Sequence, residues 1–173
     1  MFFDMFNSPV PSAHLKYYLA ILIGMCVVIL SALAFEHLGG YIPCKLCLEQ
    51  REPWYIAIPI LAVACLSLIF KGSALLTRGL LVVGGLIMLY SFWLGINHSG
   101  VEWGFWEGPT DCGAVEGGLA STTTDFLQQL EQTIPPSCTE AALRVFGLSF
   151  AGWNAVMSLV LAASALLTSF IKS

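Results

Sequence analysis

The chain has 173 residues, of which 57% are hydrophobic and 10% are charged, and its formal net charge at pH 7 is −4. A soluble domain carries roughly 25% charged residues, so this composition excludes a water-soluble globule and favours a membrane protein. The acidic balance also argues against nucleic-acid binding, because no basic stripe is present to neutralise phosphates.

Four uncharged or nearly uncharged stretches are long enough to cross a bilayer, whose hydrocarbon core needs about 20 helical residues. They cover residues 17–35, 54–70, 79–96 and 145–171. Pro59 lies inside the second stretch and is expected to kink that helix without ending it. We therefore predict an all-α membrane protein, a single domain over residues 1–173 built as a four-transmembrane-helix bundle.

The first stretch has features of a cleaved secretory signal. Lys16 precedes it, and Ala32-Leu33-Ala34 resembles a small-residue cleavage site. Because the apolar run is longer than the usual core of such a signal, we expect it to be retained as a helix.

The distribution of charge predicts the orientation in the membrane. Four spans place both termini on one side, together with the short connection 71–78. That side carries four basic residues and one acid, whereas the loops 36–53 and 97–144 carry three basic residues and ten acids. Because basic residues concentrate on the cytoplasmic side, both termini are expected there and the two loops outside.

The second outer loop contains a predicted short helix at about residues 124–133. Thr124 is a suitable N-cap, and apolar residues follow at helical spacing until Pro135 and Pro136. We expect this helix to lie in the membrane interface, although a covering flap without membrane contact fits the same pattern.

Six cysteines divide into two classes. Cys26 and Cys65 lie within apolar stretches and are expected to act as small apolar side chains. Cys44, Cys47, Cys112 and Cys138 lie in the two outer loops. On the outer side of a membrane, such cysteines can form disulfides.

The spacing Cys44-Lys45-Leu46-Cys47 permits a disulfide in a turn or at a helix start and is typical of thiols with a lowered pKa. Structural zinc needs a second such pair or histidines at matching spacing, so no metal site is predicted. Haem attachment needs a histidine where Leu48 stands. A disulfide with a purely structural role fits the same spacing.

Arg51 follows Cys47 by four residues and would share its face in a helix that starts here. Its positive charge would stabilise a thiolate and, equally, a reduced, anionic ring oxygen on a neighbouring acceptor. The alternative is an arginine that extends to the lipid headgroups.

The pattern Cys44-x-x-Cys47-Leu48-x-Gln50-Arg51-x-Pro53-x-Tyr55 resembles the signature of the disulfide bond formation protein B (DsbB) family, the quinone-linked thiol oxidases of bacterial inner membranes. The run from His98 to Trp106, followed by Gly108-Pro109 and Cys112, resembles that family's second outer loop. The resemblance extends to the four spans and to the order of the two cysteine pairs.

This resemblance implies a dithiol:quinone oxidoreductase. Cys112 and Cys138 would form the pair that meets a soluble periplasmic thioredoxin-like (DsbA-type) oxidase, and Cys112 would be attacked first. Cys138 would then attack Cys44. Cys47 would lie nearest the ring of a ubiquinone or menaquinone. These steps follow ordinary thiol–disulfide exchange.

The same resemblance implies that Arg51 binds a quinone oxygen and that His98 lies near the quinone. At the outer end of the third span, His98 could donate a hydrogen bond or a proton to the reduced ring. An ordinary histidine at headgroup level is the alternative.

Two other functions compete with this interpretation. The vitamin K epoxide reductase-like family also combines four helices with quinone chemistry, but there the loop cysteines precede the C-x-x-C. A structural tetraspan protein with two stabilising disulfides explains the cysteines but gives no role to Gln50, Arg51 or His98.

Overall fold

A computed structural model describes residues 10–109 and 138–171 of the chain. The predicted loop helix at 124–133 lies outside these residues, and so does Cys112.

Four long helices form the bundle. They are α2 (Leu15–His37), α4 (Glu52–Ile69), α5 (Ala74–Glu102) and α7 (Phe150–Phe170). Short elements join them: the 3₁₀ helix η1 (Ser12–His14), the helix α3 (Lys45–Glu49), and the strands β1 (Arg144–Val145) and β2 (Leu148–Ser149), which pair antiparallel. All four spans are long and apolar enough to cross a membrane, so the predicted all-α four-span bundle is confirmed.

The ends of the spans differ from the predicted ranges. The third helix begins five residues earlier than expected, where the Ser73 side chain accepts a hydrogen bond from Leu76 N at 3.2 Å. It includes the charged Arg78, which is buried and donates to the carbonyl of Ser169 in α7 at 2.8 Å. The charged residue therefore lies inside the helix and not before its start, because a carbonyl of the neighbouring helix accepts a hydrogen bond from its guanidinium.

The last helix begins at Phe150, although the hydropathy pattern predicted helix from residue 145. Phe146 and Gly147 have φ values of 51° and 83° and turn the chain between β1 and β2. This left-handed backbone cannot continue into an α-helix. Ser149 then caps α7 by accepting a hydrogen bond from Gly152 N at 3.2 Å.

The second span is divided into α3 and α4. Pro53 has no N–H to donate to the carbonyl four residues earlier, so the helical ladder breaks at this point. Tighter bonds replace it, from Arg51 N to the Leu48 carbonyl at 2.9 Å and from Trp54 N to the Arg51 carbonyl at 3.1 Å. Pro59, in contrast, lies inside α4 without ending it.

Three of the helices pack closely through small residues. A Cβ atom on Gly95 of α5 would lie 2.8 Å from the backbone nitrogen of Ala155 in α7. One on Gly84 would clash with the Leu61 side chain of α4. Such small residues let the helix backbones approach one another in a membrane.

A buried polar network joins the same three helices. Trp54 Nε1 of α4 donates to Asn154 Oδ1 of α7 at 2.9 Å, and Asn154 Nδ2 donates to the Ser91 carbonyl of α5 at 3.3 Å. Ser158 adds a hydroxyl–hydroxyl bond to Ser91 at 3.0 Å. Hydrogen bonds of this kind satisfy polar groups that lipid cannot.

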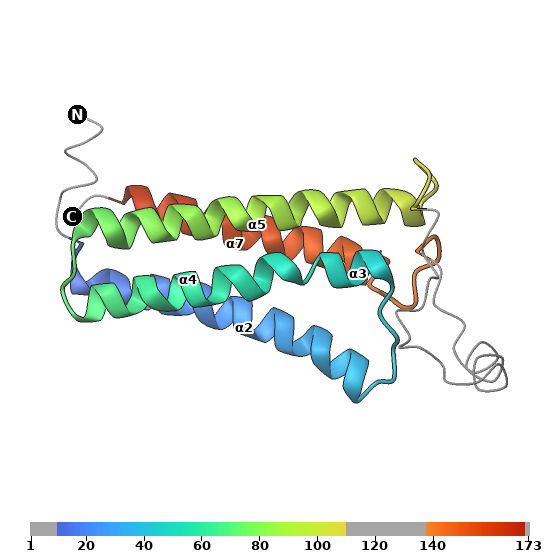
Figure 1. Cartoon of the computed structure of the whole chain (residues 1–173), viewed down its shortest axis with the longest axis horizontal. Coiled ribbons are helices and arrows are strands. Elements are labelled where there is room, and N and C mark those ends of the chain that lie inside the picture. Colours follow the sequence, from blue (N-terminus) through green and yellow to red (C-terminus); the bar gives the residue numbers. More distant parts are fainter. Residues whose placement is uncertain (1–9, 110–137, 172–173) are drawn as a thin grey trace, which may run out of the picture.

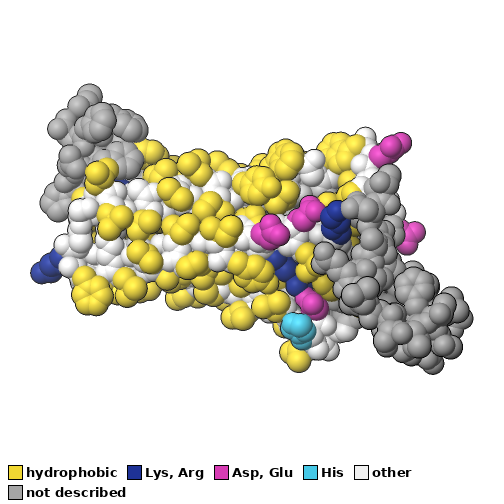
Figure 2. All heavy atoms as spheres, in the orientation of Figure 1, with side chains coloured by type: hydrophobic (Ala, Val, Ile, Leu, Met, Phe, Trp, Pro, Cys, Tyr) yellow, Lys and Arg dark blue, Asp and Glu magenta, His cyan; other side chains and the backbone are white. Residues whose placement is uncertain are grey.

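The surface matches a membrane-spanning body. Figure 2 shows a broad band of apolar side chains, with Lys or Arg at the end of the bundle near the α4–α5 connection. Acidic side chains gather towards the opposite end, where further Lys or Arg side chains lie among them. The C-x-x-C pair lies at that acidic end (Figure 1).

Candidate active site

The C-x-x-C motif lies at the start of α3. Cys44 is the N-cap residue, and its sulfur accepts a hydrogen bond from the backbone N–H of Cys47 at 3.3 Å. Both thiols are free, and their sulfur atoms are 2.7 Å apart. A disulfide has an S–S length of about 2.05 Å, so oxidation of this dithiol to the bridge requires the sulfur atoms to approach by less than about 1 Å.

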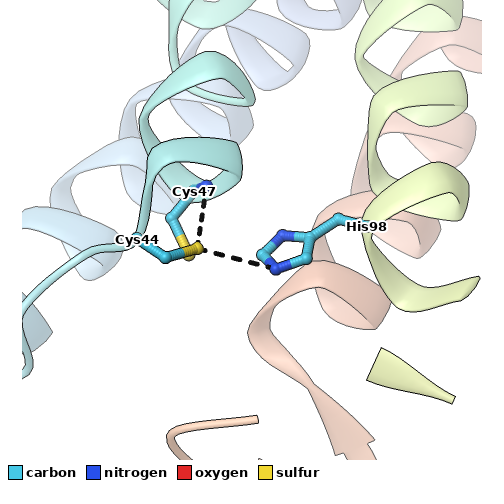
Figure 3. Close-up of side chains that lie close together, drawn as sticks. All are labelled: Cys44, Cys47 and His98. Carbon is cyan, nitrogen blue, oxygen red and sulfur yellow. Dashed lines mark hydrogen bonds between the residues drawn. The ribbon is translucent and has the colours of Figure 1, made fainter. Parts of the chain in front are cut away.

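His98 approaches this pair from α5, 54 positions further along the chain (Figure 3). Its Nε2 lies 3.6 Å from the Cys44 sulfur, and its Nδ1 lies 2.5 Å from the Gln50 amide. His98 is only 3% exposed. The Gln50 contact therefore fixes the orientation of a buried ring whose other nitrogen faces a thiol.

Cys44 is set up to be the thiolate of the pair. The hydrogen bond with the Cys47 thiol lowers its pKa, burial opposes this, and the His98 contact lowers it further, so that the pKa of Cys44 falls from 9.0 to about 5. The N-cap position contributes because the helix N-terminus favours a negative charge.

The two sulfurs have different surroundings. Cys44 belongs to a small buried cluster with Val101 and Cys138. Cys47 packs against the same cluster and also lines a cavity of about 370 Å³ on its other side. One motif thus connects Cys138 with the cavity.

The cavity lies between α2, α4 and α7. Apolar side chains from these helices make up most of its wall, among them Val28, Phe35, Trp54, Ala151 and Met157. Polar side chains are in the minority on the wall. They include Gln50 and Arg51, which follow Cys47 in the chain, and Glu36, which pairs with Arg51. A planar, largely apolar molecule with a polar edge suits such a wall.

Arg51 is paired, which the sequence did not indicate. Its Nη1 donates to a carboxylate oxygen of Glu36 at the end of α2, and the two side chains are 14% and 23% exposed. Although Pro53 interrupts the helix that was expected to carry Cys47 and Arg51 together, both residues line the same cavity. The arginine is therefore paired with a carboxylate of another helix.

The remaining predicted site residues lie as follows. His98 contacts Cys44, Gln50 and Glu102 and is absent from the cavity wall. Cys138 is disulfide-bonded. Cys26 and Cys65 carry free thiols within α2 and α4.

Sequence reasoning gave no role to Gln50, Glu36 or Glu102. Gln50 stands inside the quoted motif, but its contact with His98 crosses 48 positions. Glu102 follows His98 by four residues, a helical spacing that could have indicated the pair.

A scan against protein-family models matches residues 15–168 to the family described as disulfide bond formation protein DsbB. The chain belongs to the DsbB family. A curated relative is an uncharacterized protein of Rickettsia prowazekii (strain Madrid E), which is 27% identical over 143 residues, or 82% of this chain and 80% of the relative. No solved structure matches the chain.

Membership of the DsbB family identifies the chain as a multi-pass membrane oxidoreductase of disulfide bond formation. The thiols at the head of α3 are the groups suited to that chemistry. A purely structural tetraspan scaffold gives no account of this membership or of the contacts around Cys44.

Proposed function

We propose that the protein re-oxidises a periplasmic thioredoxin-like dithiol oxidase of the DsbA type and passes the electrons through its two cysteine pairs to a membrane quinone. The observation that carries this proposal is the placement of the C-x-x-C pair. Cys44 packs with Cys138, whereas Cys47 lines an apolar cavity.

The relay is a sequence of thiol–disulfide exchanges. A thiolate of the soluble partner attacks Cys112 of the Cys112–Cys138 bridge, and the partner's second thiol resolves the mixed disulfide and leaves the outer pair reduced. Cys138, as its thiolate, then attacks Cys44, and the Cys47 sulfur leaves and takes up a proton. Resolution by Cys112 restores the outer bridge and leaves Cys44 and Cys47 as the dithiol. The shared cluster of Cys44 and Cys138 supports this order.

The cavity beside Cys47 is the proposed quinone site. Its volume of about 370 Å³ falls within the range of ordinary ligand pockets, and its mostly apolar wall fits an isoprenoid quinone. Arg51 would hold a ring oxygen, with Glu36 fixing the guanidinium. When bound, the quinone accepts two electrons and two protons from the dithiol and becomes the quinol. The Cys44–Cys47 bridge is thereby restored.

The resemblance implied that His98 lies near the quinone ring, whereas this proposal places it beside the thiol pair. Its ring faces the Cys44 sulfur, where it stabilises the thiolate. We therefore assign it to the thiol pair, and we leave the ring oxygen to Arg51.

The acidic outer end would face the periplasm, with the protein in a bacterial inner membrane and both termini in the cytoplasm. The one-sided distribution of basic residues supports this orientation.

The direct test mixes purified protein with a reduced thioredoxin-like partner and a soluble quinone analogue, while the quinone absorbance is followed. The native protein should turn over, Cys47→Ser should not, and Cys26→Ser should behave as native, because Cys26 lies in α2 away from the pair. A partner whose second cysteine is replaced by serine cannot resolve the mixed disulfide, so it should remain trapped on Cys112. An adduct recovered on Cys44 or Cys47 would contradict the order of the relay.

A further inference from the structure

The thiol pair and His98 form a group of metal-ligand atoms. The sulfurs of Cys44 and Cys47 and a ring nitrogen of His98 all lie within 4.8 Å of one another (Figure 3). Spacing along the chain did not indicate this group, since the histidine comes from α5, far from the cysteines in sequence.

The distances suit a tetrahedral zinc site. Zinc–sulfur bonds of about 2.3 Å and zinc–nitrogen bonds of about 2.05 Å place sulfur and nitrogen about 3.6 Å apart and two sulfurs about 3.8 Å apart. Cys44 Sγ and His98 Nε2 are already 3.6 Å apart. The sulfurs are 2.7 Å apart and must separate by about 1 Å to reach the zinc–thiolate geometry. Cys47 borders the cavity, which provides room for this movement.

Glu102 can supply an oxygen as the fourth ligand if its side chain moves towards the sulfurs, because its carboxylate lies beside His98 but outside the group of three ligand atoms. Its Oε1 lies 3.8 Å from His98 Nε2, and the two side chains are 4% and 5% exposed. Its other oxygen, Oε2, is buried and has no hydrogen-bond partner within the part of the chain that the structure describes. Because an unsatisfied buried carboxylate is costly, a cation at this point would supply the interaction that the protein does not.

Gln50 can orient the histidine for metal binding. The Gln50 amide lies 2.5 Å from His98 Nδ1. The amide nitrogen faces the ring and also donates to the Leu46 carbonyl at 3.3 Å. Turning the amide over exchanges that bond for one in which the Gln50 oxygen accepts Nδ1–H, and the lone pair of Nε2 then points towards Cys44 and Glu102. An outer hydrogen bond of this kind is the usual support of a metal-bound histidine.

We propose that the reduced Cys44–Cys47 pair, together with His98 and Glu102, binds one zinc-type divalent cation in a tetrahedral site. Two thiolates and an imidazole select zinc over magnesium or calcium, which prefer oxygen ligands. Binding needs both sulfurs as thiolates, so it releases to solvent whatever protons the two thiols still carry and changes no oxidation state. The disulfide form has no thiolate to offer, so metal binding and the Cys44–Cys47 bridge exclude each other.

If the proposed relay holds, zinc withdraws the inner pair from it and so inhibits electron transfer. Metal binding itself needs neither quinone nor soluble partner and is measured without them. A failure to bind metal would therefore leave the relay standing, and a failure of quinone reduction would leave the metal site standing.

The test uses full-length protein in detergent with Cys112→Ser and Cys138→Ser, so that only the inner pair can supply outer thiolates. Cobalt(II) is the spectroscopic probe and zinc the competitor. The dithiol form should bind one equivalent, show the ligand-field and sulfur charge-transfer bands of tetrahedral cobalt, and lose both bands when zinc is added. The same preparation with the Cys44–Cys47 disulfide formed should bind none.

Ligand variants with matched controls test the remaining positions. His98→Gln should weaken binding by roughly tenfold or more, and Glu102→Gln should weaken it and shift the cobalt bands. His37→Gln and Glu107→Gln alter exposed residues of the same types and should leave binding unchanged. Equal binding by the dithiol and disulfide forms, or full affinity in His98→Gln, would overturn the site. Unchanged bands in Glu102→Gln would overturn the fourth ligand.

Discussion

Cys44 should titrate far below an ordinary thiol, and alkylation of the reduced protein measures this. The geometry lowers the pKa of Cys44 from 9.0 to about 5, with the Cys47 thiol as the largest cause and His98 next among the groups that lower it. The thiolate is therefore present above about pH 5 and is lost as the pH falls through that value. The assay follows carboxamidomethylation of Cys44 by mass spectrometry, without quinone.

The size of the effect depends on pH. At pH 5.5 a thiol of pKa 5 is about 76% thiolate and one of pKa 9 about 0.03%, a ratio of roughly 2,400. A lower pKa also weakens the nucleophile, by about 40- to 100-fold over four units. The net gain at pH 5.5 is thus about 25- to 60-fold over an ordinary thiol such as glutathione, whereas at pH 7 the two rates should be within about threefold.

Two variants separate the causes of this shift. Cys47→Ala removes the principal hydrogen bond and should raise the midpoint most, and His98→Gln should raise it less. His37→Gln, on the exposed end of α2, serves as the control. A native midpoint at or above pH 8 would refute the reasoning, because Cys44 would then behave as an ordinary thiol.

Three further substitutions test the quinone contact, the buried polar network and the packing of α5 against α7. Arg51→His should raise the apparent KM for quinone by about tenfold to a hundredfold, which is the value of one charged hydrogen bond. Reduction of the protein by the soluble partner should continue in this variant. Arg51→Lys should restore part of the affinity for quinone. Asn154→Leu removes the bonds to α4 and α5 and should lower stability by about 1–2 kcal/mol in thermal unfolding, whereas Asn97→Leu, which loses a bond within its own helix, should have little effect. Gly95→Leu should force α5 from α7 and cost about 1–3 kcal/mol or more, and Gly79→Leu, with open space at its Cβ position, is the control. Equal unfolding temperatures within either pair of variants would contradict the packing described.

The fold could be predicted because hydropathy alone specifies spanning helices. The third and fourth helices show the limit of that prediction. Arg78 can lie within α5 because a carbonyl of α7 accepts a hydrogen bond from its side chain. The helix α7 begins only at Phe150 because a two-stranded hairpin occupies the preceding residues. Both causes are contacts or backbone angles that a hydropathy window does not contain.

The candidate site was predictable only in its local part. The cysteine pair and Arg51 lie within eight consecutive residues, so their spacing indicated a common site. The Arg51 partner, Glu36, comes from another helix, and Gln50 meets His98 across the bundle. Such contacts depend on how helices assemble, which a single sequence does not reveal.

The pairing of Arg51 with Glu36 has a consequence for how a lipid-soluble substrate would reach the cavity. α4, α5 and α7 are held together by the buried polar network and close glycine contacts, whereas the outer end of α2 diverges from them (Figure 1). The ion pair fastens that end of α2 to the start of α4. Opening this ion pair, together with the ring contact between Phe35 of α2 and Phe150 of α7, would release the outer end of α2 and admit a long-tailed molecule to the cavity sideways from the bilayer. The contacts that join α4, α5 and α7 would remain in place.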